Sequence, residues 1–187
     1  AVAGEGAVWV GRRRKAATAP DSVLRVDPGT NRVAKELVFG EEGVQSLDVG
    51  GGAVWITNSR RDRVSRLSVR TGVRESRVVG RRPRGVAFAA GRVWTANYDD
   101  GTVTELSQGL DRRSVQAVGP GPTGIAGAGG ALWVTNFLGG TVTRIDAETG
   151  RVEDSVAVGR NPFAVVARGD LAWVTNYGDG TVTRIRA

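Results

Sequence analysis

A unit of about 40 residues recurs five times along the chain, and this recurrence constrains the fold more than any other feature. Each unit contains one tryptophan, and successive tryptophans are 46, 39, 39 and 40 positions apart. The tryptophan lies in a short apolar run such as AVWITN or ALWVTN, which a turn connects to a second β-prone run such as RVSRLS or TVTRID. No 3.6-residue periodicity accompanies these runs, which argues against helical repeats of similar length. The pattern predicts radially repeated four-stranded sheets.

The predicted fold is therefore an all-β propeller in which each repeat forms one four-stranded blade. The repeats span approximately residues 1–43, 44–83, 84–122, 123–162 and 163–187 of a single domain. The first repeat carries an insertion of five residues within Arg12–Pro20, and the fifth stops in its third strand and lacks an outer strand. We therefore expect an excerpt of a larger ring; the alternative is a five-blade ring closed only by packing. Pro83, Pro122 and Pro162 are expected to end an outer strand and begin the crossing to the next sheet.

One face of the predicted disc collects basic and aromatic residues. In an antiparallel blade, the loops between the second and third strands emerge on the same face as the loops that lead to the next blade. The candidate binding residues on this face are Arg12, Arg13, Arg14, Lys15, Arg60, Arg61, Arg81, Arg82, Arg84, Tyr98, Phe137 and Tyr177. The same loops contain Arg160, Glu41, Glu42, Asp99, Asp100 and Asp179. We expect a partner to bind here, since the opposite face has mainly short glycine turns.

Two sets of repeated residues are interpreted as structural. The tryptophans stand in the middle of apolar strands, which is typical of packing between sheets rather than of a stacking platform for sugars or bases. They are Trp9, Trp55, Trp94, Trp133 and Trp173. The asparagines that end these strands, Asn58, Asn97, Asn136 and Asn176, are expected to bond the turn backbone. The alternative for the asparagines is a ring of amides that binds a ligand at the tunnel mouth.

The composition gives little support to catalysis or to metal binding. The chain has no histidine and no cysteine, so it offers no histidine base, no thiol nucleophile and no disulfide. Asp99, Asp100 and Asp179 could supply oxygen ligands to Ca²⁺, but their loops lack the spacing of a calcium-binding loop, and we expect no metal. No segment matches a phosphate-binding loop, and no cofactor is expected.

The net charge is +7, and arginine supplies almost all of the positive charge. Coding bias in a GC-rich genome explains this, and a basic surface that recruits anionic partners is the alternative interpretation. The run Arg12–Lys15 occurs in one repeat only; it is either a solvated loop or a contact for an acidic protein surface, a cell-wall polymer or lipid headgroups. Nucleic acid is less favoured because no aromatic residues are interleaved with this run. No apolar run is long enough to span a bilayer, so we expect no membrane insertion.

The repeat resembles the YVTN-type β-propeller repeat, which is related to NHL repeats and to the streptogramin lyase propellers. The resemblance rests on Trp-Val-Thr-Asn followed by Gly-Thr-Val-Thr-Arg-Ile-Asp and Thr-Gly, and it is strongest over residues 130–150 and 171–185. It is weaker over residues 1–45, where Gly11 and Arg12 replace the threonine and the asparagine. It implies an extracytoplasmic or secreted location, since family members are often secreted or form the outer sensor part of membrane proteins. Lyases of this family rely on histidines with an acid and a metal, and this chain has no histidine to carry that role.

These observations predict a non-catalytic β-propeller module that binds a protein or another anionic partner through its basic, loop-rich face. Two alternatives stay open. One is part of a lyase-like or oxidoreductase propeller enzyme whose catalytic residues lie outside this segment, and the other is a mainly structural repeat scaffold. The unpaired third strand of the fifth blade could also support self-association through that edge.

Overall fold

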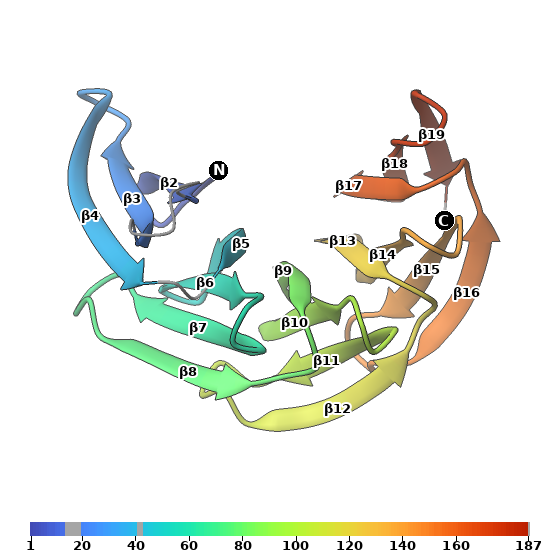
Figure 1. Ribbon diagram of the computed structural model, residues 1–187, viewed down its shortest axis with the longest axis horizontal. Helices are drawn as coiled ribbons and strands as arrows, with labels where there is room; N and C mark the ends of the chain where they lie inside the picture. The colour runs from blue at the N-terminus through green and yellow to red at the C-terminus, as the bar shows by residue number, and fades with distance from the viewer. Residues whose placement is uncertain (14–19, 41–42, 187) are drawn as a thin grey trace.

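The computed structural model describes residues 1–13, 20–40 and 43–186, which form five antiparallel sheets around one centre (Figure 1). Blade 1 contains β1 (Val2–Gly4), β2 (Ala7–Arg12), β3 (Asp21–Asp27) and β4 (Arg32–Gly40). Blade 2 contains β5 (Val44–Gly50), β6 (Ala53–Asn58), β7 (Arg63–Ser68) and β8 (Arg74–Val78). Blade 3 contains β9 (Pro83–Ala89), β10 (Arg92–Asn97), β11 (Thr102–Leu106) and β12 (Arg112–Ala117). Blade 4 contains β13 (Pro122–Ala128), β14 (Ala131–Asn136), β15 (Thr141–Asp146) and β16 (Val152–Ala157).

Blade 5 has three described strands, namely β17 (Pro162–Arg168), β18 (Leu171–Asn176) and β19 (Thr181–Arg186). Within every blade, consecutive strands pair in chain order. The predicted all-β propeller architecture is confirmed, including a fifth blade whose described part lacks the outer strand. Within the described ranges, no helical segment has the length and apolar character needed to cross a bilayer.

The hydrophobic core consists of four clusters, each of which lies between two neighbouring blades. Trp9, Trp55, Trp94 and Trp133 each belong to one cluster and pack against the following blade. Their burial is nearly complete, whereas Trp173 of blade 5 is half-buried. Because the middle strands are covered on both faces, β6 and β14 are buried at every position and show no apolar–polar alternation.

The three repeated prolines occupy a different place from the one expected. Pro83, Pro122 and Pro162 are the first residues of β9, β13 and β17, not the last residues of outer strands. A proline lacks an N–H group, and the first position of a strand is one of the few sheet positions that tolerates this loss. The prolines therefore mark where each inner strand begins.

The blades follow an arc, as Figure 1 shows. The inner strands β5, β9, β13 and β17 lie near its centre, and the outer strands β4, β8, β12 and β16 lie on its rim. A gap separates blade 1 from blade 5, so one face of blade 5 has no neighbouring blade among the described residues. The inner strands bring residues from distant parts of the chain to one point at the centre of the arc.

Candidate functional site

Four equivalent residues, one from each inner strand of blades 2 to 5, converge at the centre of the arc. Each inner strand begins with Val44 or a proline that pairs with the asparagine at the end of the neighbouring strand. The next residue in each strand is Gln45, Arg84, Thr123 or Phe163. The pairing register shifts directly after the first residue in all four strands, so this position belongs to a β-bulge. Bulges re-aim side chains, which explains how this position comes to face the centre.

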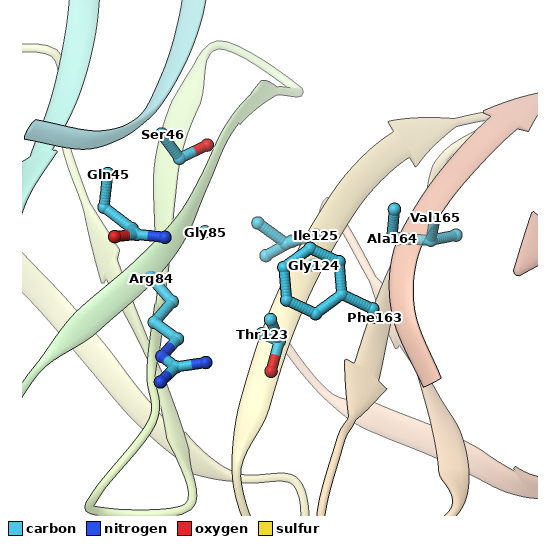
Figure 2. A pocket seen from close by; sticks show the side chains of 10 residues that line it. All are labelled: Gln45, Ser46, Arg84, Gly85, Thr123, Gly124, Ile125, Phe163, Ala164 and Val165. Atoms are coloured by element: carbon cyan, nitrogen blue, oxygen red, sulfur yellow. The ribbon is translucent and has the colours of Figure 1, made fainter. Parts of the chain in front are cut away.

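These residues line a cavity of about 230 Å³ (Figure 2). Its walls are formed by Gln45, Ser46, Arg84, Gly85, Thr123, Gly124, Ile125, Phe163, Ala164 and Val165. Figure 2 shows the Arg84 guanidinium and the Gln45 amide on one side and the Phe163 ring on the other. The cavity therefore has a polar, cationic side and an apolar, aromatic side.

Threonines of the Trp-x-Thr-Asn pattern hold the backbone of the cavity in place. The Thr57 hydroxyl donates to the Arg84 carbonyl at 3.2 Å and accepts the Ser46 N–H at 3.0 Å. Thr135 repeats this arrangement between blades 4 and 5, donating to the Phe163 carbonyl at 3.0 Å and accepting the Gly124 N–H at 2.8 Å. Each threonine thus joins the inner strand of its own blade to that of the next. Ala96 stands at the same position of blade 3 and has no hydroxyl to do so.

Two glycines allow the inner strands to approach each other closely. A Cβ atom on Gly85 would lie 2.5 Å from the Thr123 carbonyl oxygen, and one on Gly124 would lie 2.7 Å from the Phe163 carbonyl oxygen. Any side chain at either position would therefore push neighbouring inner strands apart. The close approach sets the width of the cavity.

Arg84 supplies the positive charge of the cavity. Its guanidinium carbon lies 3.8 Å from the centre of the Tyr98 ring, a favourable cation–π contact. Among the described residues, no carboxylate forms an ion pair with Arg84, although its neighbour Arg82 pairs with Asp99 at 3.4 Å. Burial lowers the pKa of Arg84 below its ordinary value, and the nearby charges of Arg82 and Arg13 act in the same direction. Arg84 nevertheless keeps its positive charge at neutral pH, because an arginine side chain is effectively always protonated in proteins.

Gln45 adds a hydrogen-bond donor beside Arg84. Its side-chain oxygen accepts a hydrogen bond from Arg13 at 2.8 Å. Figure 2 shows the nitrogen of the same amide directed toward the cavity. Arg13 therefore fixes the orientation in which Gln45 presents its NH₂ group to the centre.

An arc of aromatic rings connects Arg84 with Phe163, two residues that line the cavity. The ring centres of Tyr98 and Phe137 are 6.5 Å apart, and those of Phe137 and Phe163 are 6.3 Å apart. The loop backbone places the first two rings, since the Tyr98 N–H donates to the Arg82 carbonyl at 3.2 Å and the Phe137 N–H donates to the Gly121 carbonyl at 2.9 Å. The Tyr177 N–H likewise donates to the Asn161 carbonyl, but Tyr177 is 77% exposed and does not belong to this arc of rings.

Several other arginines of this face are neutralised by local carboxylates. Asp100 accepts the Arg81 Nε–H at 2.6 Å and the Arg81 backbone N–H at 2.6 Å, and Asp179 binds Arg160 in the same manner. These hydrogen bonds hold the pKa values of Asp100 and Asp179 below the ordinary value. Arg12 forms an ion pair with Glu36 in its own blade.

The structure brings five of the predicted binding residues toward the cavity and leaves others apart. The five are Arg13, Arg82, Arg84, Tyr98 and Phe137. Arg60 and Arg61 are exposed in the β6–β7 turn, and Arg12 and Arg81 are engaged in ion pairs. Arg14 and Lys15, together with Glu41 and Glu42 of the same face, lie outside the described residues. Sequence analysis missed Gln45, Thr123 and Phe163, which only their shared position directly after Val44 or a proline could have indicated, and it missed Ser46, which follows Gln45.

The asparagines at the ends of the second strands are buried, and their side chains form hydrogen bonds with hydroxyl groups of the third strand in addition to the expected loop backbone. The Asn97 amide donates to Thr102 and Thr104, the Asn136 amide to Thr141 and Thr143, and the Asn176 amide to Thr181 and Thr183. Asn58 instead accepts a hydrogen bond from Ser65 at 2.7 Å. They therefore tie the second strand of a blade to its third. Within the described part of the chain, no group of three or more acidic side chains is arranged to hold a metal ion.

Comparisons with known proteins support the fold and leave the activity open. A scan against models of protein families finds no match, and a search of curated protein sequences finds none either. The chain is similar to the structure of Kuenenia stuttgartiensis hydrazine synthase, with a TM-score of 0.71 and 18% identity over 78% of this chain and 46% of that chain. It therefore spans about half of that relative's length.

Two further solved structures share the fold. The first is the nidogen–laminin complex, with a TM-score of 0.67 and 16% identity over 89% of this chain and 68% of that chain. The second is streptogramin B lyase, with a TM-score of 0.57 and 16% identity over 100% of this chain and 81% of that chain. The chain is thus a β-propeller domain by architecture. Enzymes and a protein complex both appear among these relatives, so the fold does not determine the function.

Proposed function

We propose that this chain is a non-catalytic β-propeller module that binds an acidic protein or another anionic partner through its basic, loop-rich face. The observation that carries the proposal is the convergence of Arg13 and Arg84 at the centre of this face, where neither forms an ion pair with a described carboxylate. Arg81, Arg160 and Arg12 lie on the same face but are already paired with carboxylates. Cations without a local counter-charge are the ones that a negatively charged partner can neutralise.

The aromatic arc supports the same proposal. Tyr98, Phe137 and Phe163 present ring surface beside the arginines, and aromatic residues together with arginine are enriched at the centres of protein interfaces. The enzyme alternative is supported only by the shared fold of hydrazine synthase and streptogramin B lyase. We further propose an extracytoplasmic location, with which a chain without cysteine is compatible.

The test uses fluorescein-labelled poly-L-glutamate as the acidic probe and fluorescence anisotropy as the readout. The double variant Arg13→Gln with Arg84→Gln should bind the probe about three- to tenfold more weakly than the unmodified chain, since partly exposed ion pairs contribute up to about 1 kcal/mol each. The control is Arg70→Gln with Arg151→Gln, which removes the same charge from exposed turns on the opposite face. The control should bind the probe nearly as well as the unmodified chain.

Equal losses in the two double variants would show that net charge alone drives binding, and would overturn the assignment to this face. The ionic-strength dependence gives a second readout. Binding through the face should weaken as salt increases, with a smaller salt dependence in the Arg13 and Arg84 variant.

A further inference from the structure

We propose that the central cavity is a binding site for a small carboxylate that carries an apolar or aromatic group. The inference deepens the proposed function and rests on it in one respect, namely that the loop-rich face is the side from which ligands approach. Its basis is the division of the cavity into a cationic side and an aromatic side, built from four equivalent positions of different chemistry.

The cationic side fits a carboxylate. Arg84 offers a planar fork of N–H donors that matches the two oxygens of a carboxylate, and its partial burial strengthens the interaction relative to water. The Gln45 NH₂ group and the Ser46 hydroxyl are further donors on the same side. Thr123 contributes as an acceptor only, because its hydroxyl hydrogen is donated to the Gly121 carbonyl at 3.0 Å. The set of donors thus suits one planar anionic group.

The apolar side fits a hydrocarbon group. Phe163 is 43% exposed although it lies beside Ile125 and Val165, and its ring faces the cavity (Figure 2). Covering an exposed aromatic ring with an apolar group removes that surface from water and is favourable. A ligand that joins a carboxylate to such a group would satisfy both sides at once.

The size and charge of the cavity exclude other ligand classes. Its volume of about 230 Å³ lies below the range typical of drug-sized ligands, so it suits a single ring or branched chain with a short linker. One guanidinium undercompensates a phosphate dianion, and no described carboxylate lines the cavity to bind a cation. A sugar would leave its hydroxyl groups against Phe163 and Ile125 without partners.

Two sources share this chemistry. One is a free organic acid, and the other is the C-terminal residue of a polypeptide with an apolar side chain. The experiment therefore uses 3-phenylpropionate as the free acid and a pentapeptide ending in phenylalanine with a free carboxylate. The neutral control is 3-phenylpropionamide, and acetate is the control that lacks the ring.

Binding is measured by isothermal titration calorimetry on the full chain, with the side-chain amide resonance of Gln45 followed by NMR as a local reporter. We expect 3-phenylpropionate to bind at least about tenfold more tightly than either control, because the amide lacks the charge that strengthens the hydrogen bonds to Arg84 and acetate lacks the ring that covers Phe163. Arg84→Gln should weaken binding at least about tenfold, and Phe163→Ala about three- to tenfold. Arg84→Lys keeps the charge without the planar fork and should give an intermediate loss.

The outcomes separate the two proposals. Phe163→Ala should bind 3-phenylpropionate about three- to tenfold more weakly but bind poly-L-glutamate as the unmodified chain does, whereas Arg70→Gln with Arg151→Gln should bind both nearly unchanged. Three outcomes would overturn the cavity site, independently of whether the face binds poly-L-glutamate. They are equal binding of 3-phenylpropionate and its amide, unchanged binding in Arg84→Gln, and the absence of both a heat signal and a shift of the Gln45 resonance. Tighter binding of the peptide than of the free acid would identify a chain terminus as the source, and the reverse would identify a free acid.

Discussion

Asp100 and Asp179 show how a single carboxylate can join two loops of a blade. Each binds both the backbone N–H and the Nε–H of an arginine that precedes it by 19 residues, Arg81 in blade 3 and Arg160 in blade 5. The arginine stands in the loop that leads into the blade, and the aspartate stands in the loop between the second and third strands. The pair therefore holds together the two loops that form the rim of the binding face.

The first prediction concerns the pH dependence of this arrangement. An acid whose pKa is lower in the folded than in the unfolded state stabilises the fold above its unfolded pKa and loses this contribution as the pH falls through the folded pKa. The pKa values of Asp100 and Asp179 are both lowered, so their contribution should be full at neutral pH and decline below about pH 4. The double variant Asp100→Asn with Asp179→Asn should have a lower melting temperature at pH 7, and the difference should shrink in acid.

The control for this measurement is Glu148→Gln, which changes an exposed carboxylate of a turn on the opposite face. It should leave the melting temperature nearly unchanged at both pH values. Burial raises the pKa of Asp48 and so acts in the opposite sense, but this residue is present in every variant and cancels from the differences. A difference between the double variant and the unmodified chain that stays constant with pH would contradict the prediction.

At the scale of the strands, the cavity depends on how closely the inner strands approach. Thr57 and Thr135 join the inner strands by hydrogen bonding between blades 2 and 3 and between blades 4 and 5. Gly85 and Gly124 permit the close approach sterically between blades 3 and 4 and between blades 4 and 5. Between blades 3 and 4, the threonine is replaced by Ala96, so packing at Gly85 carries the contact there. This boundary lies between Arg84 and Thr123, two residues of the cavity wall.

The second prediction follows from that boundary. Gly85→Ala would place a Cβ atom 2.5 Å from the Thr123 carbonyl oxygen, so β9 and β13 must move apart. We expect a loss of about 1–3 kcal/mol in the free energy of unfolding, as for other overpacked sites, together with weaker binding of 3-phenylpropionate. Gly109→Ala is the matched control, because its Cβ would meet no atom closer than 3.5 Å. Urea denaturation measures the free energy of unfolding of the two variants, and equal stability of Gly85→Ala and Gly109→Ala would contradict the prediction.

The sequence predicts the blades well but not the cavity, and the physical reason lies in the inner strands. The tryptophans of blades 1 to 4 pack in the same way between neighbouring blades, so periodicity reveals this structural role. The cavity residues Gln45, Arg84, Thr123 and Phe163 occupy one repeat position but share no chemistry, so periodicity conceals them. Their convergence depends on a bulge at the start of each inner strand, which the sequence marks only by a proline in three of the four cases. Arg84 is predicted from its charge and from its place in a connection between two blades, not from its position in an inner strand.

At the scale of the whole molecule, the described blades form an arc whose last blade has one uncovered face. Val182 shows this directly. It is 63% exposed in blade 5, whereas the equivalent valines of the other blades, Val23, Val64, Val103 and Val142, are at most 1% exposed. Val166 on the inner strand β17 of the same blade is also exposed, and β19 pairs with β18 alone among the described strands. Blade 5 thus combines an apolar face with a free strand edge, the two features that favour association with another sheet.

The third prediction is that this 187-residue chain associates with a second copy through blade 5. Burying Val182 and Val166 removes apolar surface from water and stabilises the contact by roughly 1.5–3 kcal/mol for each side chain that becomes fully buried. Val182→Lys should shift the molar mass measured by light scattering toward that of a monomer, because a lysine cannot be buried there without losing its hydration. Val115→Lys is the matched control, since Val115 is 47% exposed on the outer strand of blade 3, away from blade 5. A chain that is monomeric at every concentration, or a control that dissociates as readily as Val182→Lys, would show that this face does not mediate self-association.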